Sequence, residues 1–194
     1  KGKEISDEEV GLEKFSEFHE EPLAAASIAQ VHRATLKSGE EVVVKIRRPG
    51  VKEQVEKDLD ILNYLAKLGE KHLPDLKQMD VVKFVSEFSD WTRQELDMEK
   101  ECLNAQVFKE NMEDEENVYI PEVYPDLTTE KVLVMEYVEG VKCTDEEKLK
   151  ELDIDEKEIA KTAIRAGMRQ SMIDGFFHAD PHPSNFLISE EGKI

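Results

Sequence analysis

Two polar residues near the end of the chain have the types and the spacing that phosphoryl chemistry needs. In the segment HADPHPSN, residues 178–185, Asp180 stands five residues before Asn185. An aspartate in such a loop can orient an attacking hydroxyl or water and accept its proton. The side-chain oxygen of an asparagine is a hard ligand that suits Mg²⁺ on phosphate groups. The segment follows a predicted helix and precedes an apolar strand, so we expect a loop that presents both side chains.

Two other interpretations of this loop stay open. His178, Asp180 and His182 alternate along the chain and could together hold a metal ion. No further cluster of histidine or cysteine completes a coordination shell, which disfavours that interpretation. The loop could also be structural, with histidines that only satisfy hydrogen bonds.

A lysine on a predicted strand is the second candidate. The segments 28–36 and 41–47 are rich in β-branched residues and flank the turn sequence KSGE, which predicts a hairpin. Alternation along the second strand divides its side chains between two faces. One face carries Val42, Val44 and Ile46, and the other carries Val43, Lys45 and Arg47. An inward-facing Lys45 needs an acidic partner, unless it extends to solvent from the edge of a sheet.

A glutamate on a predicted helix offers that partner. After a helix from Val51 to Pro74, the sequence predicts a second helix from near Asp80 to beyond Cys102. Its apolar stripe consists of Val81, Phe84, Phe88, Trp91, Met98 and Cys102. Glu95 falls on this stripe, where an unpaired carboxylate would be costly. We therefore expect Lys45 and Glu95 to form an ion pair, with a Glu95–Lys100 salt bridge as the alternative.

Two further segments suggest a nucleotide. The sequence MEYVEG, residues 135–140, ends a predicted strand at a glycine. Backbone groups of Glu136 and Val138 at such a strand end could pair with the edge of an adenine, with Met135 behind it. Any strand end can look like this, so the segment gains weight only from its position between Lys45 and Asp180.

An alanine-rich segment precedes the predicted hairpin. Ala24, Ala25, Ala26 and Ser27 stand where a phosphate-binding loop would carry glycines. Glycine loops let backbone amides approach phosphate with φ above zero, a conformation that a Cβ atom penalises. We expect a loop that binds nucleotide in a restricted way and favours slow or redirected phosphate chemistry. The alternative is an alanine-rich turn that only packs.

Together these motifs resemble the UbiB family of atypical kinases, also called the ADCK or aarF-domain family. The resemblance rests on AAASIAQVH in place of a glycine-rich loop, on VVVKIRRPG, on the glutamate-x-aspartate motif in QELDME, and on HADPHPSN. It covers roughly residues 21–194, nearly the whole chain. Residues 178–185 match the spacing of the kinase catalytic loop, and VVVKI matches the kinase strand that carries the phosphate-binding lysine, with Val43 at the position of an alanine.

The resemblance implies an α+β, protein-kinase-like fold of two lobes, with ATP and Mg²⁺ as cofactors. We expect a linker or short helix over residues 1–20, the N-lobe with inserted helices over 21–140, and a partial C-lobe with the catalytic loop over 141–194. Lys45 would contact the phosphates, Glu95 would hold Lys45, Asp180 would act as base or orient water, and Asn185 would bind the metal. The nucleotide would also contact the alanine loop, Val43, Met135, Glu136 and Val138. The family supports the metabolism of ubiquinone or related isoprenoid lipids, and its activity resembles ATP hydrolysis more than protein phosphorylation.

Some family features differ or are missing. Ser184 replaces the glycine that usually precedes the asparagine, and the family's lysine-x-glycine-glutamine motif is absent. The Asp-Phe-Gly segment is also absent, so we expect the 194 residues alone to be catalytically inactive. Two alternative functions remain: a nucleotide-gated binding module of the pseudokinase type, and a small-molecule phosphotransferase of the aminoglycoside or choline kinase type.

Composition disfavours some partners. A formal charge of −19 disfavours nucleic acid and anionic lipid surfaces. No apolar run is long enough to span a membrane. The two cysteines, Cys102 and Cys143, suit a reducing compartment. We expect a cytoplasmic location, mitochondrial if the source is a eukaryote, with membrane association only through segments outside this sequence. The resemblance to the UbiB family implies an isoprenoid lipid or quinone-biosynthesis proteins as partners.

Overall fold

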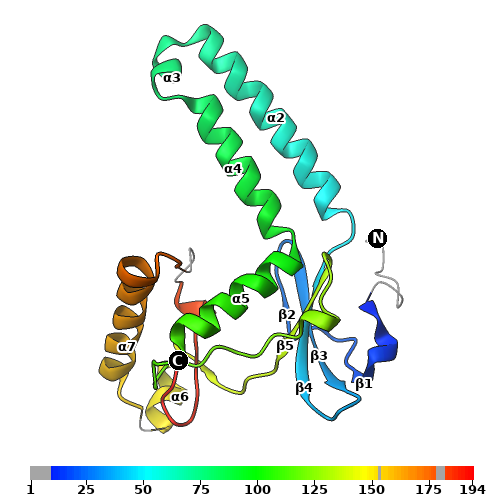
Figure 1. Ribbon diagram of the computed structural model, residues 1–194, viewed down its shortest axis with the longest axis vertical. Helices are drawn as coiled ribbons and strands as arrows, with labels where there is room; N and C mark the ends of the chain where they lie inside the picture. The colour runs from blue at the N-terminus through cyan, green and yellow to red at the C-terminus, as the bar shows by residue number, and fades with distance from the viewer. Residues whose placement is uncertain (1–9, 153, 178–181) are drawn as a thin grey trace. The chain divides into compact units, whose positions relative to one another are not determined.

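The computed structural model describes residues 10–152, 154–177 and 182–194 (Figure 1). The chain divides into two compact units. The first comprises the chain up to Cys102 together with Tyr124–Met135, and the second comprises Leu103–Val123 together with Glu136–Ile194. This division differs from the predicted boundary at residue 140, because residues 103–123 group with the later part of the chain.

A sheet of five strands forms the centre of the first unit. Strand β3 pairs antiparallel with β1, β2 and β4, and β5 lies beside β4. The strands are β1 (Phe15–Phe18), β2 (Ala24–Ala25), β3 (Ala29–Leu36), β4 (Glu41–Arg47) and β5 (Val132–Glu136). The predicted hairpin is therefore confirmed, with Gly39 in its turn at a φ of 99°. Part of the segment predicted as a linker or short helix is instead a short 3-10 turn, Leu12–Lys14, followed by β1.

One face of this sheet forms the core of the first unit. The buried residues of this core are Phe15, Ala34, Leu36, Val42, Val44, Ile46, Val132 and Val134. Val42, Val44 and Ile46 are the face of β4 that the sequence predicted to be apolar. Lys45 therefore belongs to the opposite face, as expected from the alternation of side chains.

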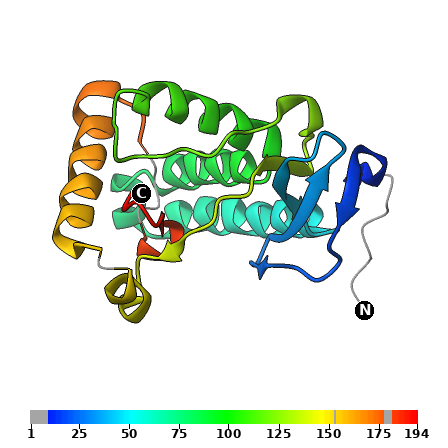
Figure 2. The same ribbon diagram turned by 90° about the horizontal axis from the view of Figure 1, so that it is seen from below.

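A long helical hairpin follows the sheet. Helix α2 (Val51–His72) and helix α4 (Val81–Glu95) run side by side in both views, with the short α3 (Pro74–Gln78) at their tip (Figures 1 and 2). Leu59 and Ala66 of α2 and Val85 and Ser89 of α4 are buried. The stripe predicted for α4 is not its buried face, because Phe84, Phe88 and Trp91 are 68%, 40% and 51% exposed.

The predicted second helix is two helices. Helix α4 ends at Glu95, and α5 (Met98–Met112) begins after a break at Leu96 and Asp97. The Asp97 carboxylate accepts a hydrogen bond from the N–H of Glu99 (3.1 Å), as an N-cap residue does. The first turn of α5 also carries Glu99 and Glu101, which suit the positive end of a helix dipole.

The second unit is mostly helical. Helix α6 (Glu146–Glu151) and helix α7 (Glu156–Arg169) begin at the capping side chains of Asp145 and Asp155. Helix α7 continues into a π-helical turn, Gln170–Asp174, which ends at Gly175 with φ of 63°. Strands β6 (Val141–Lys142) and β7 (Leu187–Ile188) form an antiparallel pair. Among the residues described, no helix has both the length and the apolar character needed to cross a membrane.

Candidate active site

Lys45 forms an ion pair with a glutamate of α5. Its Nζ atom lies 2.7 Å from Oε1 and 2.8 Å from Oε2 of Glu101. The side chains are only partly exposed, 27% for Lys45 and 41% for Glu101. The pair joins a strand lysine to a helix glutamate, so the type of interaction that the sequence predicted is present with a different glutamate.

The prediction that Glu95 is the partner of Lys45 is wrong. Glu95 is the last residue of α4 and is exposed. The ion pairs between described residues join Glu95 to neither Lys45 nor Lys100. The error arose because helical spacing was continued across the break at Leu96 and Asp97, where the phase of the helix changes.

The alanine-rich segment lies on the same face of the sheet as Lys45. Ala24 of β2 is in register with Val31 of β3, and Val31 is in register with Lys45 of β4. Residues directly opposite each other across neighbouring strands point to the same face. Ala24, Val31 and Lys45 therefore form a row across three strands. Val31 was missed from the sequence, and its register with Lys45 is the feature that identifies it.

The alanines adopt the conformations that their Cβ atoms favour. Among the non-glycine residues described, only Asp80 has a positive φ, so Ala24, Ala25 and Ala26 do not adopt the left-handed conformations of a glycine loop. The Ala24–Ser27 side chains are exposed, which argues against the alternative of a turn that only packs.

An arginine of the VVVKIRRPG segment fastens this loop. The Nε of Arg48 donates to the C=O of Ala26 (3.0 Å), and the backbone N–H of Arg48 donates to the C=O of Ile28 (2.8 Å). The loop is thereby fixed to the end of the strand that carries Lys45.

The segment predicted to pair with adenine lies where the two units meet along the chain. Met135 is the last residue of the first unit, and the second unit resumes at Glu136. The Glu136 carboxylate accepts hydrogen bonds from the Tyr119 hydroxyl (2.7 Å) and the Glu122 N–H (2.9 Å). The Glu136 N–H donates to the C=O of Glu122 (2.8 Å). These hydrogen bonds fix the start of the segment. They do not test whether the backbone groups of Glu136 and Val138 contact a nucleotide, so those contacts stay a prediction.

Gly140 brings that segment against the strand after Asn185. A Cβ atom at Gly140 would lie 3.0 Å from the backbone oxygen of Ile188, so this close approach favours a glycine. Asn185 ends the 3-10 turn Pro183–Asn185, and its N–H donates to the C=O of His182 (2.9 Å). Within the second unit, the end of the predicted adenine segment and the strand after the predicted metal ligand are therefore neighbours.

Part of the predicted catalytic loop lies outside the described residues. This applies to His178 and Asp180, and so to the base predicted at Asp180 and to the alternative metal site. Among the described residues, no group of three or more His, Cys, Asp or Glu side chains could hold a metal ion.

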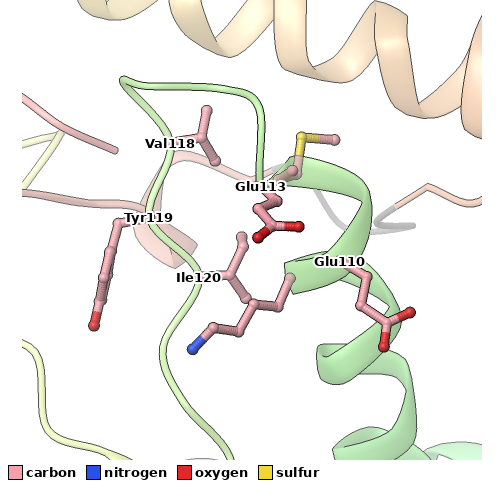
Figure 3. Close-up of a pocket in the computed structure, with 7 residues that line it drawn as sticks. Glu110, Glu113, Val118, Tyr119 and Ile120 are labelled. Atoms are coloured by element: carbon pink, nitrogen blue, oxygen red, sulfur yellow. The ribbon is translucent and has the colours of Figure 1, made fainter.

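A separate cavity in the second unit does not include the predicted site residues. Its volume is about 380 Å³, and Lys109, Glu110, Met112, Glu113, Val118, Tyr119 and Ile120 line it. Figure 3 shows Glu113 and Ile120 directed into the space between α5 and the following loop, whereas the ends of Glu110 and Tyr119 point away. The Lys109 ammonium is paired with the Glu122 carboxylate. This cavity therefore provides no additional support for the nucleotide prediction.

A strand lysine paired with a helix glutamate, on the sheet face that also carries Ala24 of the short strand β2, is the arrangement of a protein-kinase-like domain. The chain belongs to the family of ABC1 atypical kinase-like domains, whose model matches residues 5–194. The resemblance to the UbiB and ADCK proteins is thereby confirmed.

Known proteins agree with this assignment. The chain is 44% identical over 177 residues to the probable protein kinase UbiB of Pseudomonas putida. The matched region covers 91% of this chain and 33% of that protein. It is 40% identical over 191 residues to the chloroplastic protein ACTIVITY OF BC1 COMPLEX KINASE 8 of Arabidopsis thaliana, covering 96% of this chain and 25% of that protein. The structure of Rv3197 with erythromycin, from Mycobacterium tuberculosis, matches with a TM-score of 0.69 and 27% identity, over 98% of this chain and 50% of that one. The chain spans about a third of the length of the UbiB relative.

Proposed function

We propose that the chain is the ATP-binding part of an atypical kinase or ATPase. The observation that carries the proposal is the Lys45–Glu101 ion pair on the same sheet face as Ala24 and Val31. A lysine held by a carboxylate presents a fixed positive charge, which is what the α- and β-phosphates of ATP require. The family supports the same assignment.

Each residue of the site then has a role. Lys45 contacts the phosphates, Glu101 replaces Glu95 as the residue that holds Lys45, and the Ala24–Ser27 segment covers the phosphates. Val43, Val31, Met135 and the backbone of Glu136 and Val138 surround the adenine. Asp180 orients the attacking hydroxyl or water and accepts its proton.

The residue that we propose for Mg²⁺ is Asn185. The amide oxygen of Asn185 is a hard donor of the kind that Mg²⁺ prefers. When bound, Mg²⁺ neutralises charge on the β- and γ-phosphates. Asn185 would hold the ion, and Lys45 would orient the phosphates.

Nucleotide titrations with a lysine variant test the proposal. Lys45→Met should weaken the binding of a fluorescent ATP analogue by at least about tenfold, because it removes a charge-assisted contact worth about 1.5–3 kcal/mol. The matched control is Lys57→Met, since Lys57 is an exposed lysine of α2. Equal affinities of the two variants would refute the nucleotide site.

The role of Asn185 has a separate test. Asn185→Ala should reduce the dependence of nucleotide binding on Mg²⁺ while leaving metal-free binding nearly unchanged. An unchanged Mg²⁺ dependence would remove Asn185 from the metal site.

A second candidate function is nucleotide-gated binding of a partner without turnover. The alanine segment favours it, because its backbone lacks the positive φ angles of a phosphate-cradling glycine loop. Measuring ATP turnover in the full-length protein separates the candidates. Binding without Mg²⁺-dependent hydrolysis would favour the gated module.

The physiological context we propose is isoprenoid-quinone metabolism, which rests on the resemblance to the UbiB family. The partner is then an isoprenoid lipid or a quinone-biosynthesis protein. Turnover by the full-length protein should rise when an isoprenoid phenol is added in neutral detergent. An equal response to detergent alone would count against a lipid substrate or effector.

A further inference from the structure

The most deeply buried guanidinium near Lys45 belongs to Arg47, two residues further along β4. The Arg47 side chain is 7% exposed. Its Nη1 donates to the C=O of Leu96 and to the C=O of Glu130 (3.3 Å). The Glu130 carboxylate lies 3.4 Å from Nη2 and is also 2.6 Å from Nζ of Lys52. Arg47 is therefore a buried charge whose hydrogen bonds go to two loop segments.

One of these segments is the break between α4 and α5. Leu96, whose carbonyl accepts from Arg47, is 3% exposed, and Met98, the first residue of α5, is fully buried. The N–H of Met98 donates to the C=O of Glu130 (3.2 Å), the same carbonyl that Arg47 contacts. The guanidinium thus holds the carbonyl of Leu96, just after α4, and shares the Glu130 carbonyl with the first residue of α5. A fork of five N–H donors suits this task, because several acceptors can be held at fixed angles.

The start of α5 determines where Glu101 lies. Glu101 is three residues after Met98, and its N–H donates to the C=O of Asp97 (3.2 Å). Lys45 and Arg47 point to the same face of β4, about 7 Å apart along the strand. Strand β4 therefore carries both Lys45 of the ion pair and Arg47, which fixes the start of the helix that carries Glu101.

We infer that Arg47 is a positioning residue, which sets the start of α5 and thereby holds Glu101 opposite Lys45. The consequence for nucleotide rests on the proposed function. A purely structural arginine would stabilise the fold without any specific effect on the Lys45–Glu101 pair. The two roles make different predictions once Glu101 has been neutralised.

A double-mutant cycle separates them. Arg47→Met should weaken binding of the fluorescent ATP analogue by about fivefold to tenfold, a coupling typical of residues in one network. In a Glu101→Gln background the same substitution should change affinity by less than about twofold. The fall in melting temperature caused by Arg47→Met should be the same in both backgrounds. An equal loss of affinity in both backgrounds, or no loss in either, would overturn the inference.

Two further variants serve as a substitute and as a control in this experiment. Arg47→Lys keeps the charge but cannot span both segments, so its affinity should lie between those of the wild type and Arg47→Met, and it serves in the cycle if Arg47→Met does not fold. Arg93→Met is the matched control, because Arg93 pairs with Glu56 (3.0 Å) and Asp90 (3.2 Å) on the surface of the hairpin. It should leave nucleotide affinity unchanged, and a loss equal to that of Arg47→Met would overturn the inference.

Hydrogen exchange provides a readout that needs no nucleotide. Arg47→Met, or Arg47→Lys if the first does not fold, should increase exchange of the amides at Met98–Cys102 at least about fivefold more than those of α2, and Arg93→Met should not. Uniformly increased exchange would show a general loss of stability and overturn the inference. If Lys45→Met leaves nucleotide binding unchanged, the proposed function fails, and exchange at the start of α5 still decides the role of Arg47.

Discussion

Two glutamates six residues apart, one at the end of α4 and one at the start of α5, behave in opposite ways. Glu95 is exposed at the end of a helix whose aromatic residues are also largely exposed. Glu101 lies one turn into the next helix and makes two short contacts with Lys45. The chemistry of the two side chains is identical, so the difference comes from the break between them. Position relative to a helix start, rather than spacing along one continuous helix, selects the residue that meets the lysine.

The largest effect should come from the packing on the two sides of the break. Met98 is fully buried at the start of α5, whereas Phe84 on α4 is 68% exposed. We expect Met98→Ala to lower the free energy of unfolding by about 2–5 kcal/mol, because it leaves a cavity. Phe84→Ala should change it by about 0.5 kcal/mol or less. Urea unfolding monitored by circular dichroism gives both values, and similar losses would mean that the predicted α4 stripe is packed after all.

The next effect concerns the two glutamates themselves. Glu101→Gln should weaken binding of the ATP analogue by about tenfold, close to 1.4 kcal/mol, because Lys45 loses the charge that holds it. Glu95→Gln should change affinity by less than about twofold, because that side chain is exposed at the end of α4. Fluorescence titration at one salt concentration measures both. The reverse order would restore the pairing predicted from the sequence.

Local patterns in the sequence were enough to predict much of the first unit. Alternation identified the two faces of β4, and the turn sequence identified the hairpin, because both depend on neighbouring residues only. The choice between Glu95 and Glu101 depends on where α5 begins and how it packs on β4. Asp97 followed by Glu99 and Glu101 is an N-cap with an acidic first turn, and this signal could have revealed the break.

The remaining site predictions depend on long-range arrangement. The row of Ala24, Val31 and Lys45 follows from strand register, which the alternation of a single strand cannot supply. The close approach of Gly140 to Ile188 brings together residues that are far apart in the sequence. The role of Asp180 stays a prediction, because that residue lies outside the described part of the chain.

A smaller effect should appear at acidic pH and concerns Glu130, which contacts Arg47 as the break between α4 and α5 does. The hydrogen bond from Lys52, and then the charges of Lys52 and Arg47, lower the pKa of the Glu130 carboxyl below its usual 4.5. A lowered pKa in the folded state adds stability above pH 4.5, and that stability is lost as the pH falls through the folded value. Glu130→Gln should therefore be less stable than the wild type at neutral pH, and the difference should shrink in acid. Glu87→Gln, which alters an exposed pair with Lys83, is the control for neutralising a surface glutamate. A difference that stays constant down to the acid transition would exclude this linkage.

The smallest effect should appear in alkali, at the cysteine next to Glu101. Burial raises the pKa of the Cys102 thiol above its usual 9.0. A hydrogen bond with Thr128 opposes this rise in pKa, and the charge of Glu101 adds to it. The unfolded chain then releases this proton at a lower pH than the folded chain does, so its contribution to stability is complete below pH 9.0 and falls as the pH rises. Cys102→Ala should lower stability at neutral pH, because it removes a buried sulfur, but should lose less stability between neutral and alkaline pH than the wild type. Urea unfolding at a series of pH values measures both slopes, with Cys143→Ala as the matched control in a less buried position. Parallel slopes for the wild type and Cys102→Ala would mean that α5 does not keep Cys102 buried, and would weaken the contrast between the two sides of the break.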